Sequence, residues 1–304
     1  MYHINQAVIG SSEFVSSSVA EDDHPEWSAA TDYTVGDCVI RPTTHRRYEN
    51  LIAGVDATYP ENATEGTTPR WLDLGPTNRW AGLDGEVGTK TVVSSSSVES
   101  RFNLGSFDSF ALYDAIADEV VISYTVGGGV VFEKLYTLRG YSIGGWYDYW
   151  FAPRAARKGF VVGVDLPRYA AAEVTVTINS EAGVSFALLM FGSMMHLGQT
   201  QKRGFSMGIK DYSVKETNEF GVLTGLVERG FAKTCEGQTK FLHNRTEEIY
   251  AYMASQRAKL GLWIPGKESG FEYTYIYGFL VDFRVHSEEV PVASTMNFEI
   301  EGVI

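Results

Sequence analysis

Hydrophobic and polar residues alternate along much of this chain, which is the pattern of half-buried β-strands. Residues 173–179 read EVTVTIN, so that Val174, Val176 and Ile178 share one face. Residues 273–285 read YTYIYGFLVDFRV and place an aromatic or branched apolar side chain at every odd-numbered position. We therefore predict two strands here, and we expect the second to be long and to carry its aromatic residues on a single face.

Two further segments are apolar without helical spacing, FVVGV at 160–164 and SFALLMFGSMM at 185–195. Such runs indicate strands that are buried on both faces. Residues 126–130, VGGGV, predict the connection of a hairpin, because glycine accepts the positive φ angles of tight turns.

One segment has the boundaries of a helix. Residues 246–261 read TEEIYAYMASQRAKLG, with Thr246 as an N-cap, two glutamates in the first turn, a lysine near the end and Gly261 just beyond. These residue types favour the two ends of a helix. We expect a helix of about 14 residues and no other substantial helix in the chain.

These patterns predict a mainly β protein with four parts. An N-terminal arm at 1–19 precedes a small aromatic β module at 20–80. A β-sandwich domain follows at 81–200, and a β-barrel-like domain at 201–304 contains the one helix, at 246–260. Serine-rich stretches on both sides of the aromatic module are typical of linkers.

Charge excludes one class of function. The 304 residues carry a formal net charge of −13, and phosphate backbones select clustered positive charge, so we expect no direct nucleic-acid binding. The N-terminus lacks the positive region of a signal peptide, and no run reaches the ~18 apolar residues of a membrane span, so we expect no membrane insertion. Cys38 and Cys235 are far apart and lack CxxC spacing, which favours neither a disulfide framework nor a zinc site.

Motifs for catalysis are weak. The segment GLDGEVGTKT at 82–91 lacks the adjacent glycine and lysine of a phosphate loop. His196 has no nucleophile elbow beside it, and we interpret it as a core or sheet histidine. Residues 21–27, EDDHPEW, lack the glycine pattern of a calcium loop and are interpreted as a solvated acidic linker. We predict no catalytic residue, metal or cofactor. An acid–base pair of carboxylates that are distant in sequence can still form in space, and one sequence does not identify such a pair.

The aromatic module carries the first resemblance. Its residues follow the order Trp27, Tyr33 with Gly-Asp three residues later, Tyr48, and a closing Pro-Arg-Trp71. This order resembles the short chitin- and cellulose-binding modules of bacterial glycoside hydrolases, although no hydrolase domain follows. The resemblance implies a glycan site at these four rings, because such modules stack aromatic faces on pyranose rings. The alternative is that the rings form the core, which a module of about 50 residues needs in order to fold.

A second aromatic cluster, GGWYDYWF, occupies residues 144–151. We interpret it as a strand with aromatic residues on both faces, which favours a packed core or a subunit contact over one flat sugar-binding surface. The residues of this candidate contact are Trp146, Tyr147, Tyr149 and Trp150.

A second resemblance extends over nearly the whole chain. The phrases GPTNRWAGLDGEVGTKT at 75–91 and GFSMGIKDYSVKETNEFGVLTGLVERGFAK at 204–233 are similar to segments of virion proteins of tailed bacteriophages. The last third resembles in outline the tail-tube-like barrels of distal tail proteins. This resemblance implies a non-enzymatic tail or baseplate protein, made in the host cytoplasm and located in the virion tail. Its expected partners are other copies of itself and other tail proteins.

The alternative function is recognition of host cell-surface polysaccharide by a tail protein. It requires that at least one of the four rings of the aromatic module is exposed. A glycan hydrolase that uses an acidic pair is a third hypothesis, for which the sequence offers no local signature.

Overall fold

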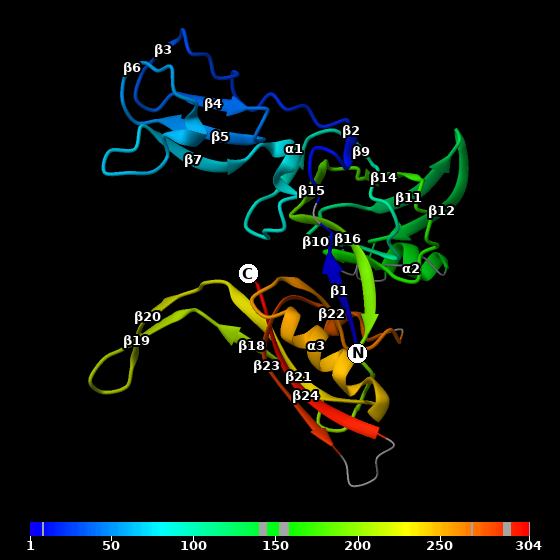
Figure 1. The fold of residues 1–304 in the computed structure, drawn as a ribbon. Helices are drawn as coiled ribbons and strands as arrows, with labels where there is room; N and C mark the ends of the chain where they lie inside the picture. The colour runs from blue at the N-terminus through cyan, green and yellow to red at the C-terminus, as the bar shows by residue number, and fades with distance from the viewer. Residues whose placement is uncertain (8, 140–144, 152–157, 269, 288–292, 304) are drawn as a thin grey trace. The chain divides into compact units, whose positions relative to one another are not determined.

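The computed structural model describes residues 1–7, 9–139, 145–151, 158–268, 270–287 and 293–303. The chain is mainly β, as predicted, with curled antiparallel sheets and few helical residues (Figure 1). It forms two compact units, one from Val8–Phe191 and one from Met1–Ala7 together with Gly192–Ile304. The first strand of the chain therefore belongs to the unit that the last third of the chain builds.

The discontinuous unit contains strands of one large antiparallel sheet, a separate two-stranded sheet and a helix. Its strands follow the order β16-β1-β22-β23-β24-β21-β17, and β18 also pairs with β21. The first strand lies between β16 and β22, where Ile4 is opposite Met194 on one side and Leu262 on the other. In Figure 1 the blue β1 accordingly runs beside strands of its own unit that come from late in the chain. The strands of this unit are β1 (Tyr2–Gln6), the end of β16 (Leu188–His196), β17 (Gln199–Thr200), β18 (Ser206–Asp211), β19 (Val214–Thr217), β20 (Leu223–Val227), β21 (Phe231–Leu242), β22 (Gly261–Ile264), β23 (Ile276–Ser287) and β24 (Ala293–Gly302).

The predicted helix is present as α3 (Thr246–Ser255), directly after a 3-10 turn, η2 (His243–Arg245). It buries Ile249 and Met253 in a core that includes Trp263. Its boundaries differ from the prediction. Thr246 does not cap the helix, because its hydroxyl donates to the carbonyl of His243. The helix ends early because the chain turns at Ala258 (φ 57°) and then enters β22 at Gly261.

Strand β23 does not keep its aromatic residues on one face, so that prediction was wrong. A register shift lies between Leu280 and Asp282. An extra residue in one strand reverses the alternation beyond it. Ile276 and Leu280 face the core before the shift, and Phe283 faces it afterwards, while Tyr273 lies outside the strand in η3 (Glu272–Thr274).

The larger unit contains a five-stranded antiparallel sheet in the order β12-β11-β14-β9-β2. Strand β14 covers residues 173–179 and alternates buried and half-buried positions as the sequence predicts. The β11–β12 hairpin turns at Gly127 (φ 59°) and Gly128 (φ 83°), which confirms the predicted connection. The bounds in this sheet are β2 (Phe14–Ser17), β9 (Ser97–Phe102), β11 (Glu119–Val126), β12 (Gly129–Thr137) and β14 (Glu173–Asn179).

The two apolar runs of this unit behave differently. The first half of β16 is buried on both faces, as predicted, but residues 193–195 are exposed or half-buried, so the prediction was wrong for the end of this run. Strand β13 alternates buried and half-buried residues, so burial on both faces was the wrong prediction there. The remaining elements around this core are α1 (Asn78–Ala81), β8 (Thr91–Val93), β10 (Ser109–Tyr113), α2 (Trp146–Phe151), β13 (Phe160–Gly163) and β15 (Val184–Phe186).

The aromatic module at the start of this unit has its own small sheets, β4-β5-β7 and β3-β6. Strand β5 is central, so that Tyr48 is opposite Val39 on one side and Asp73 on the other. The bounds are β3 (Asp32–Tyr33), β4 (Cys38–Arg41), β5 (Arg46–Asn50), β6 (Gly54–Val55), η1 (Pro60–Asn62) and β7 (Trp71–Pro76).

Candidate functional site

The four rings that the resemblance marks as a glycan site are buried together in the aromatic module. Trp71 is 0% exposed, Tyr48 1%, Tyr33 5% and Trp27 8%. The indole nitrogen of Trp71 donates to Asp56 Oδ2 at 2.9 Å. The rings of Tyr33 and Trp71 meet edge to face, with centroids 5.2 Å apart.

A buried ring has no face to offer to a pyranose, so these four residues are the core of the module and not a stacking platform. A module this small has few other large side chains with which to fill its interior. The exposed ring in the module is Tyr59, which is 48% exposed and packs beside Trp27 at a centroid distance of 5.1 Å. The guanidinium of Arg41 lies 4.2 Å above the Tyr59 ring and also pairs with Glu61 at 3.2 Å.

The second aromatic cluster is a helix, α2, and not the predicted strand. Five of the six residues of α2 are aromatic, so the sequence shows no alternation of apolar and polar residues there. The assumed two-residue period of a strand therefore had no support. The rings of Tyr147 and Phe151, four residues apart, lie 5.3 Å from each other on one side of the helix. Trp146, Tyr147 and Trp150 are 81%, 73% and 66% exposed, and the side chain of Tyr149 lies outside the described residues. A subunit contact at this helix stays a prediction.

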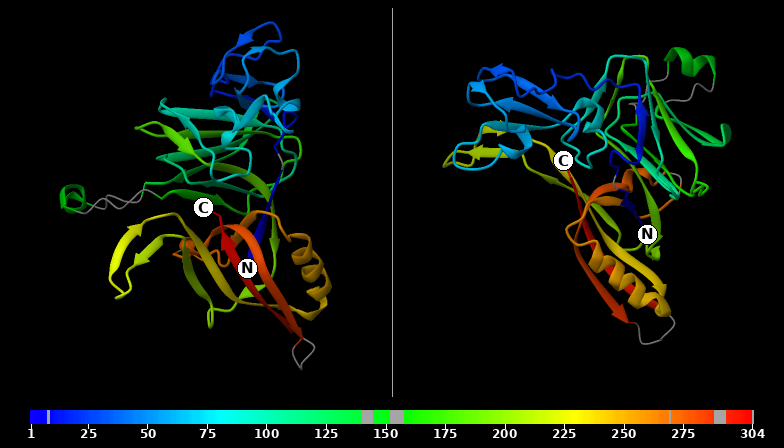
Figure 2. Two further views of the ribbon diagram at one scale, coloured as in Figure 1. Left: turned by 90° about the vertical axis from the view of Figure 1, so that its left-hand side faces the viewer. Right: turned by 45° about the horizontal axis from the view of Figure 1, so that its top comes forward.

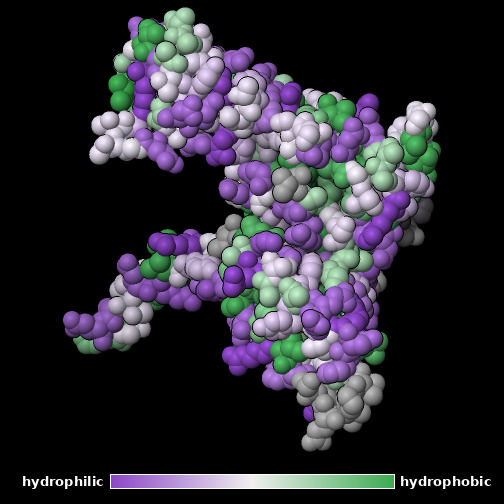
Figure 3. Space-filling model, in the orientation of Figure 1, coloured by the Kyte–Doolittle hydropathy of each residue, from purple (hydrophilic) through white to green (hydrophobic). Residues whose placement is uncertain are grey.

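A hairpin arm, defined as β19, β20 and their connection over 214–227, projects from the discontinuous unit. It continues the β18–β21 pair, and both views of Figure 2 show it, in yellow, extending beyond the rest of its own unit. Apolar surface, in green, interrupts the polar surface of the arm in Figure 3. The apolar side chains of the arm that are more than half exposed are Phe220 (88%), Val222 (58%), Leu223 (54%), Leu226 (60%) and Val227 (54%).

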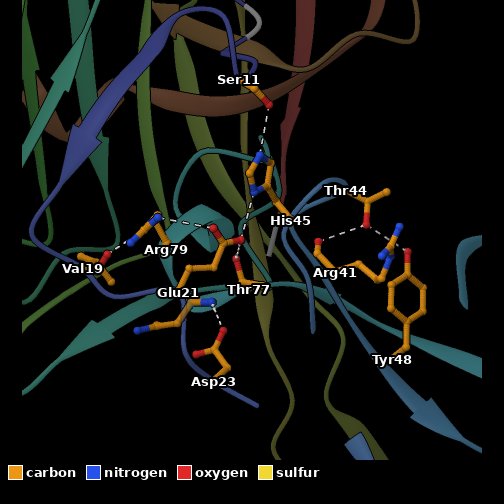
Figure 4. Close-up of polar contacts among 11 residues, drawn as sticks. Ser11, Val19, Glu21, Asp23, Arg41, Thr44, His45, Tyr48, Thr77 and Arg79 are labelled. Atoms are coloured by element: carbon orange, nitrogen blue, oxygen red, sulfur yellow. Dashed lines mark hydrogen bonds and ion pairs between the residues drawn. The ribbon is translucent and has the colours of Figure 1, made fainter. Parts of the chain in front are cut away.

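A polar network joins the aromatic module to α1 within the larger unit (Figure 4). Glu21 Oε1 accepts from His45 Nδ1 at 3.0 Å and from the hydroxyl of Thr77 at 2.9 Å, while Arg79 lies 3.4 Å from Glu21 Oε2. The His45 ring stacks on Trp80 of α1 at a centroid distance of 4.1 Å. The sequence prediction of a solvated acidic linker was therefore wrong at Glu21, whose side chain is only 9% exposed.

The network also contains a serine, histidine and carboxylate in the order of a catalytic triad. His45 Nε2 is 3.1 Å from Ser11 Oγ, and the other ring nitrogen faces Glu21. A triad needs donors that stabilise a developing oxyanion beside the serine. Here the carboxylate of Glu13 accepts from Gly10 N and from the Ser12 hydroxyl, which places a negative charge next to Ser11. The geometry therefore favours a structural joint over a hydrolytic site.

His196 lies at the end of β16 and is exposed, so it is a sheet histidine but not a core residue. Its ring packs on Tyr2 at a centroid distance of 4.7 Å and borders a cavity of the discontinuous unit. The residues near His196 in the sequence did not predict this cavity, because the lining residues come from both the first and the last parts of the chain.

Among the residues that the structure describes, no group of three or more His, Cys, Asp or Glu side chains is placed to hold a metal ion. Within the same residues, no helix has the length and apolar character needed to cross a membrane. Comparison with protein-family models, with curated proteins and with solved structures gives no match to this chain.

Proposed function

We propose that this chain is a non-enzymatic structural protein of a tailed-phage virion, a tail or baseplate component that assembles with copies of itself and with other tail proteins. The resemblance of residues 75–91 and 204–233 to virion proteins supports the proposal, and the mainly β fold is compatible with it. In this proposal the protein acts in the virion tail.

The hairpin arm is the observation that carries the proposal. An isolated two-stranded hairpin is marginally stable in water and is normally completed by further strands or by packing. The arm instead exposes Phe220, Leu226 and Val227, and contiguous exposed apolar surface is typical of interaction sites. Strand β18, at the base of the arm, pairs only with β21 among the described residues, so its other edge is open for strand pairing. A second copy of the chain that packs here would cover the apolar side chains of the arm and pair with the open edge of β18.

Symmetric repetition strengthens such a contact, because each copy of a ring makes the same interaction twice. Electron microscopy and light scattering on the purified protein test the proposal, and we expect closed rings or higher oligomers. Phe220→Glu places a charge in the apolar surface of the arm and should shift the protein to monomers. Ala254→Glu adds the same charge at an exposed position of α3, outside the arm, and is the matched control, which should leave assembly intact. A strictly monomeric wild-type protein that binds no other tail protein would contradict the proposal.

The alternative function, recognition of host polysaccharide through Trp27, Tyr33, Tyr48 and Trp71, loses its structural basis with the burial of these rings. The exposed aromatic ring of the module, Tyr59, is a single ring and does not form a flat platform.

A further inference from the structure

The tip of the hairpin arm presents an aromatic side chain on a hydrogen-bonded turn. The backbone N–H of Asn218 donates to the carbonyl of Val222, and Gly221 adopts a positive φ of 76° within the turn. Asn218 Oδ1 also accepts from the backbone N–H groups of Phe220 and Val222, at 3.0 and 2.9 Å. Phe220 is 88% exposed. Because its backbone is already ordered, burial of this ring against a partner costs little conformational entropy, as in interface anchors.

The base of the arm is attached to the sheet by polar contacts. Lys210 Nζ lies 2.9 Å from Glu301 Oε1, and the hydroxyl of Tyr212 donates to the same oxygen at 2.8 Å. Glu301 belongs to β24, so the end of β18 is linked to a second strand besides β21. The arm therefore projects from the sheet in a defined direction.

The discontinuous unit also contains a cavity of about 1090 Å³ whose lining includes four aromatic rings, those of Tyr2, Phe205, Phe271 and Tyr273. The rings of Phe271 and Tyr273 are nearly parallel, with centroids 6.1 Å apart, and Tyr273 is 57% exposed. Typical small-molecule sites have volumes of about 300–1,000 Å³. The cavity is therefore large enough for a phenyl ring together with its neighbours in a turn, and aromatic rings pack well against one another.

A smaller cavity of the same unit, of about 450 Å³, suits a phenyl ring less well. Its lining contains five charged side chains, those of Arg203, Glu236, Asp282, Arg284 and Glu299. An apolar ring placed there would remove water from these charges without offering them a hydrogen bond. The larger cavity is therefore the better receptor for Phe220.

The arm and the larger cavity lie toward opposite ends of β21. This strand begins at Phe231, where its partner β18 leads into the arm, and Lys240, nine positions later, lines the cavity. Nine residues of a strand span about 30 Å. Figures 1 and 2 show the arm on one side of this unit and the N-terminus, which borders the cavity, on the other. The arm of a copy thus points away from its own cavity.

We propose that Phe220 of one copy docks in the aromatic cavity of the next copy, so that copies join head to tail. This inference rests on the assembly proposed above and names the surface that receives the arm. Each copy carries the arm at one end and the cavity at the other, so every copy in a series uses both once. Contacts of this heterologous kind close into rings when the rotation between copies permits.

Two variants with complementary defects test the proposal by light scattering and size-exclusion chromatography. Phe220→Glu disables the arm and leaves the cavity intact. Gly266→Trp fills the cavity and leaves the arm intact, because Gly266 lines the cavity and a Cβ atom there meets nothing within 4 Å. We expect each variant alone to be monomeric. An equimolar mixture should form a dimer that does not extend, since it contains one intact pair of arm and cavity.

A third substitution measures the contribution of the aromatic wall. Tyr273→Ala, added to Phe220→Glu, should raise the dissociation constant of the mixed dimer by about tenfold, since truncation of an aromatic side chain at an interface hot spot costs at least this much. Gly88→Trp is the matched control for Gly266→Trp. It adds the same ring at an exposed glycine outside the discontinuous unit, where a Cβ atom also meets nothing within 4 Å, and it should assemble like the wild type.

The mixed dimer also verifies the folding of both variants, because each must supply one intact surface. If the wild type assembles and Gly266→Trp assembles equally well, this inference is wrong and the assembly proposal stands. A mixture of Phe220→Glu and Gly266→Trp that stays monomeric leads to the same conclusion. A wild type that stays monomeric would overturn head-to-tail docking together with self-assembly.

Discussion

The imidazole of His3 lies directly against the backbone of Gly261, and a Cβ atom at Gly261 would stand 2.2 Å from His3 Nε2. His3 belongs to β1 and Gly261 to β22, two strands that pair although they come from opposite ends of the chain. Nδ1 of the same imidazole is hydrogen bonded to the hydroxyl of Tyr252 at 2.7 Å, so the ring is held between α3 and β22. The absence of a side chain at Gly261 is therefore a condition for the pairing of β1 with β22.

Gly261→Ala should destabilise the discontinuous unit. The added methyl group has no space beside the buried His3 ring, and such overpacking costs about 1–3 kcal/mol. Gly266→Ala is the control, because a Cβ atom there meets nothing within 4 Å. Urea unfolding of both variants measures the difference, and equal stability of the two would contradict the close approach of His3 and Gly261.

The discontinuous unit should become less stable as the pH is lowered below about 6.5, the ordinary pKa of histidine. Burial lowers the pKa of His3 to about 3 in the folded protein. Between these two values the unfolded chain binds a proton that the folded chain does not, so stability increases with pH in this window. The slope from one such group is at most about 1.4 kcal/mol per pH unit.

Urea unfolding of the wild type and of His3→Gln at several pH values isolates this effect. The variant should show a shallower dependence between pH 5 and pH 6.5, a range in which most carboxylates remain ionised. Identical slopes for the two proteins would show that His3 does not titrate as proposed.

Trp71→Ala should unfold the aromatic module, since removal of a fully buried tryptophan costs about 3–5 kcal/mol. Tyr59→Ala, at an exposed aromatic position of the same module, should change the unfolding free energy much less. Scanning calorimetry compares the two variants. A stable Trp71→Ala variant that has lost retention on a polysaccharide column would contradict the core role and restore the stacking platform.

Glu21→Gln should loosen the joint between the aromatic module and α1. The substitution keeps the shape of the side chain but removes the charge that Arg79 and Thr77 meet, with an expected cost of about 1–3 kcal/mol. Ser11→Ala removes an exposed hydroxyl and should stay within about 0.5 kcal/mol of the wild type. Thermal unfolding measures both. Hydrolysis of p-nitrophenyl acetate by the wild type that disappears in Ser11→Ala would instead identify a working triad.

Sequence patterns correctly predicted those strands and turns whose burial or backbone geometry depends only on neighbouring residues. EVTVTIN at 173–179 has one solvent-facing side and one core-facing side, so its alternation is a direct record of burial. The glycines of the β11–β12 turn are required by backbone geometry alone. The prediction that β23 keeps its aromatic residues on one face was wrong because of a register shift. Such a shift depends on the partner strand β24, and the alternation within one strand does not reveal it.

The sites were less predictable, because distant residues build them. Glu21 was assigned to solvent from its acidic neighbours, whereas His45 and Arg79 bring it into a network that only the fold creates. The cavity beside His196 combines Tyr2 with residues more than 200 positions later, such as Lys267. No short motif marks such a combination.

The pairing of β1 with β16 and β22 has a consequence for the synthesis of the protein. Residues Val8–Phe191 form a contiguous unit, which has its complete sheet partners before the last third of the chain is made. Strand β1 is made long before its neighbour β22, which begins at Gly261. Closing so long a loop is entropically unfavourable and slow compared with local contacts. Strand β1 thus waits for both of its neighbours, because β16 is complete only at His196 and β22 only at Ile264, and until then its edges are open to wrong partners.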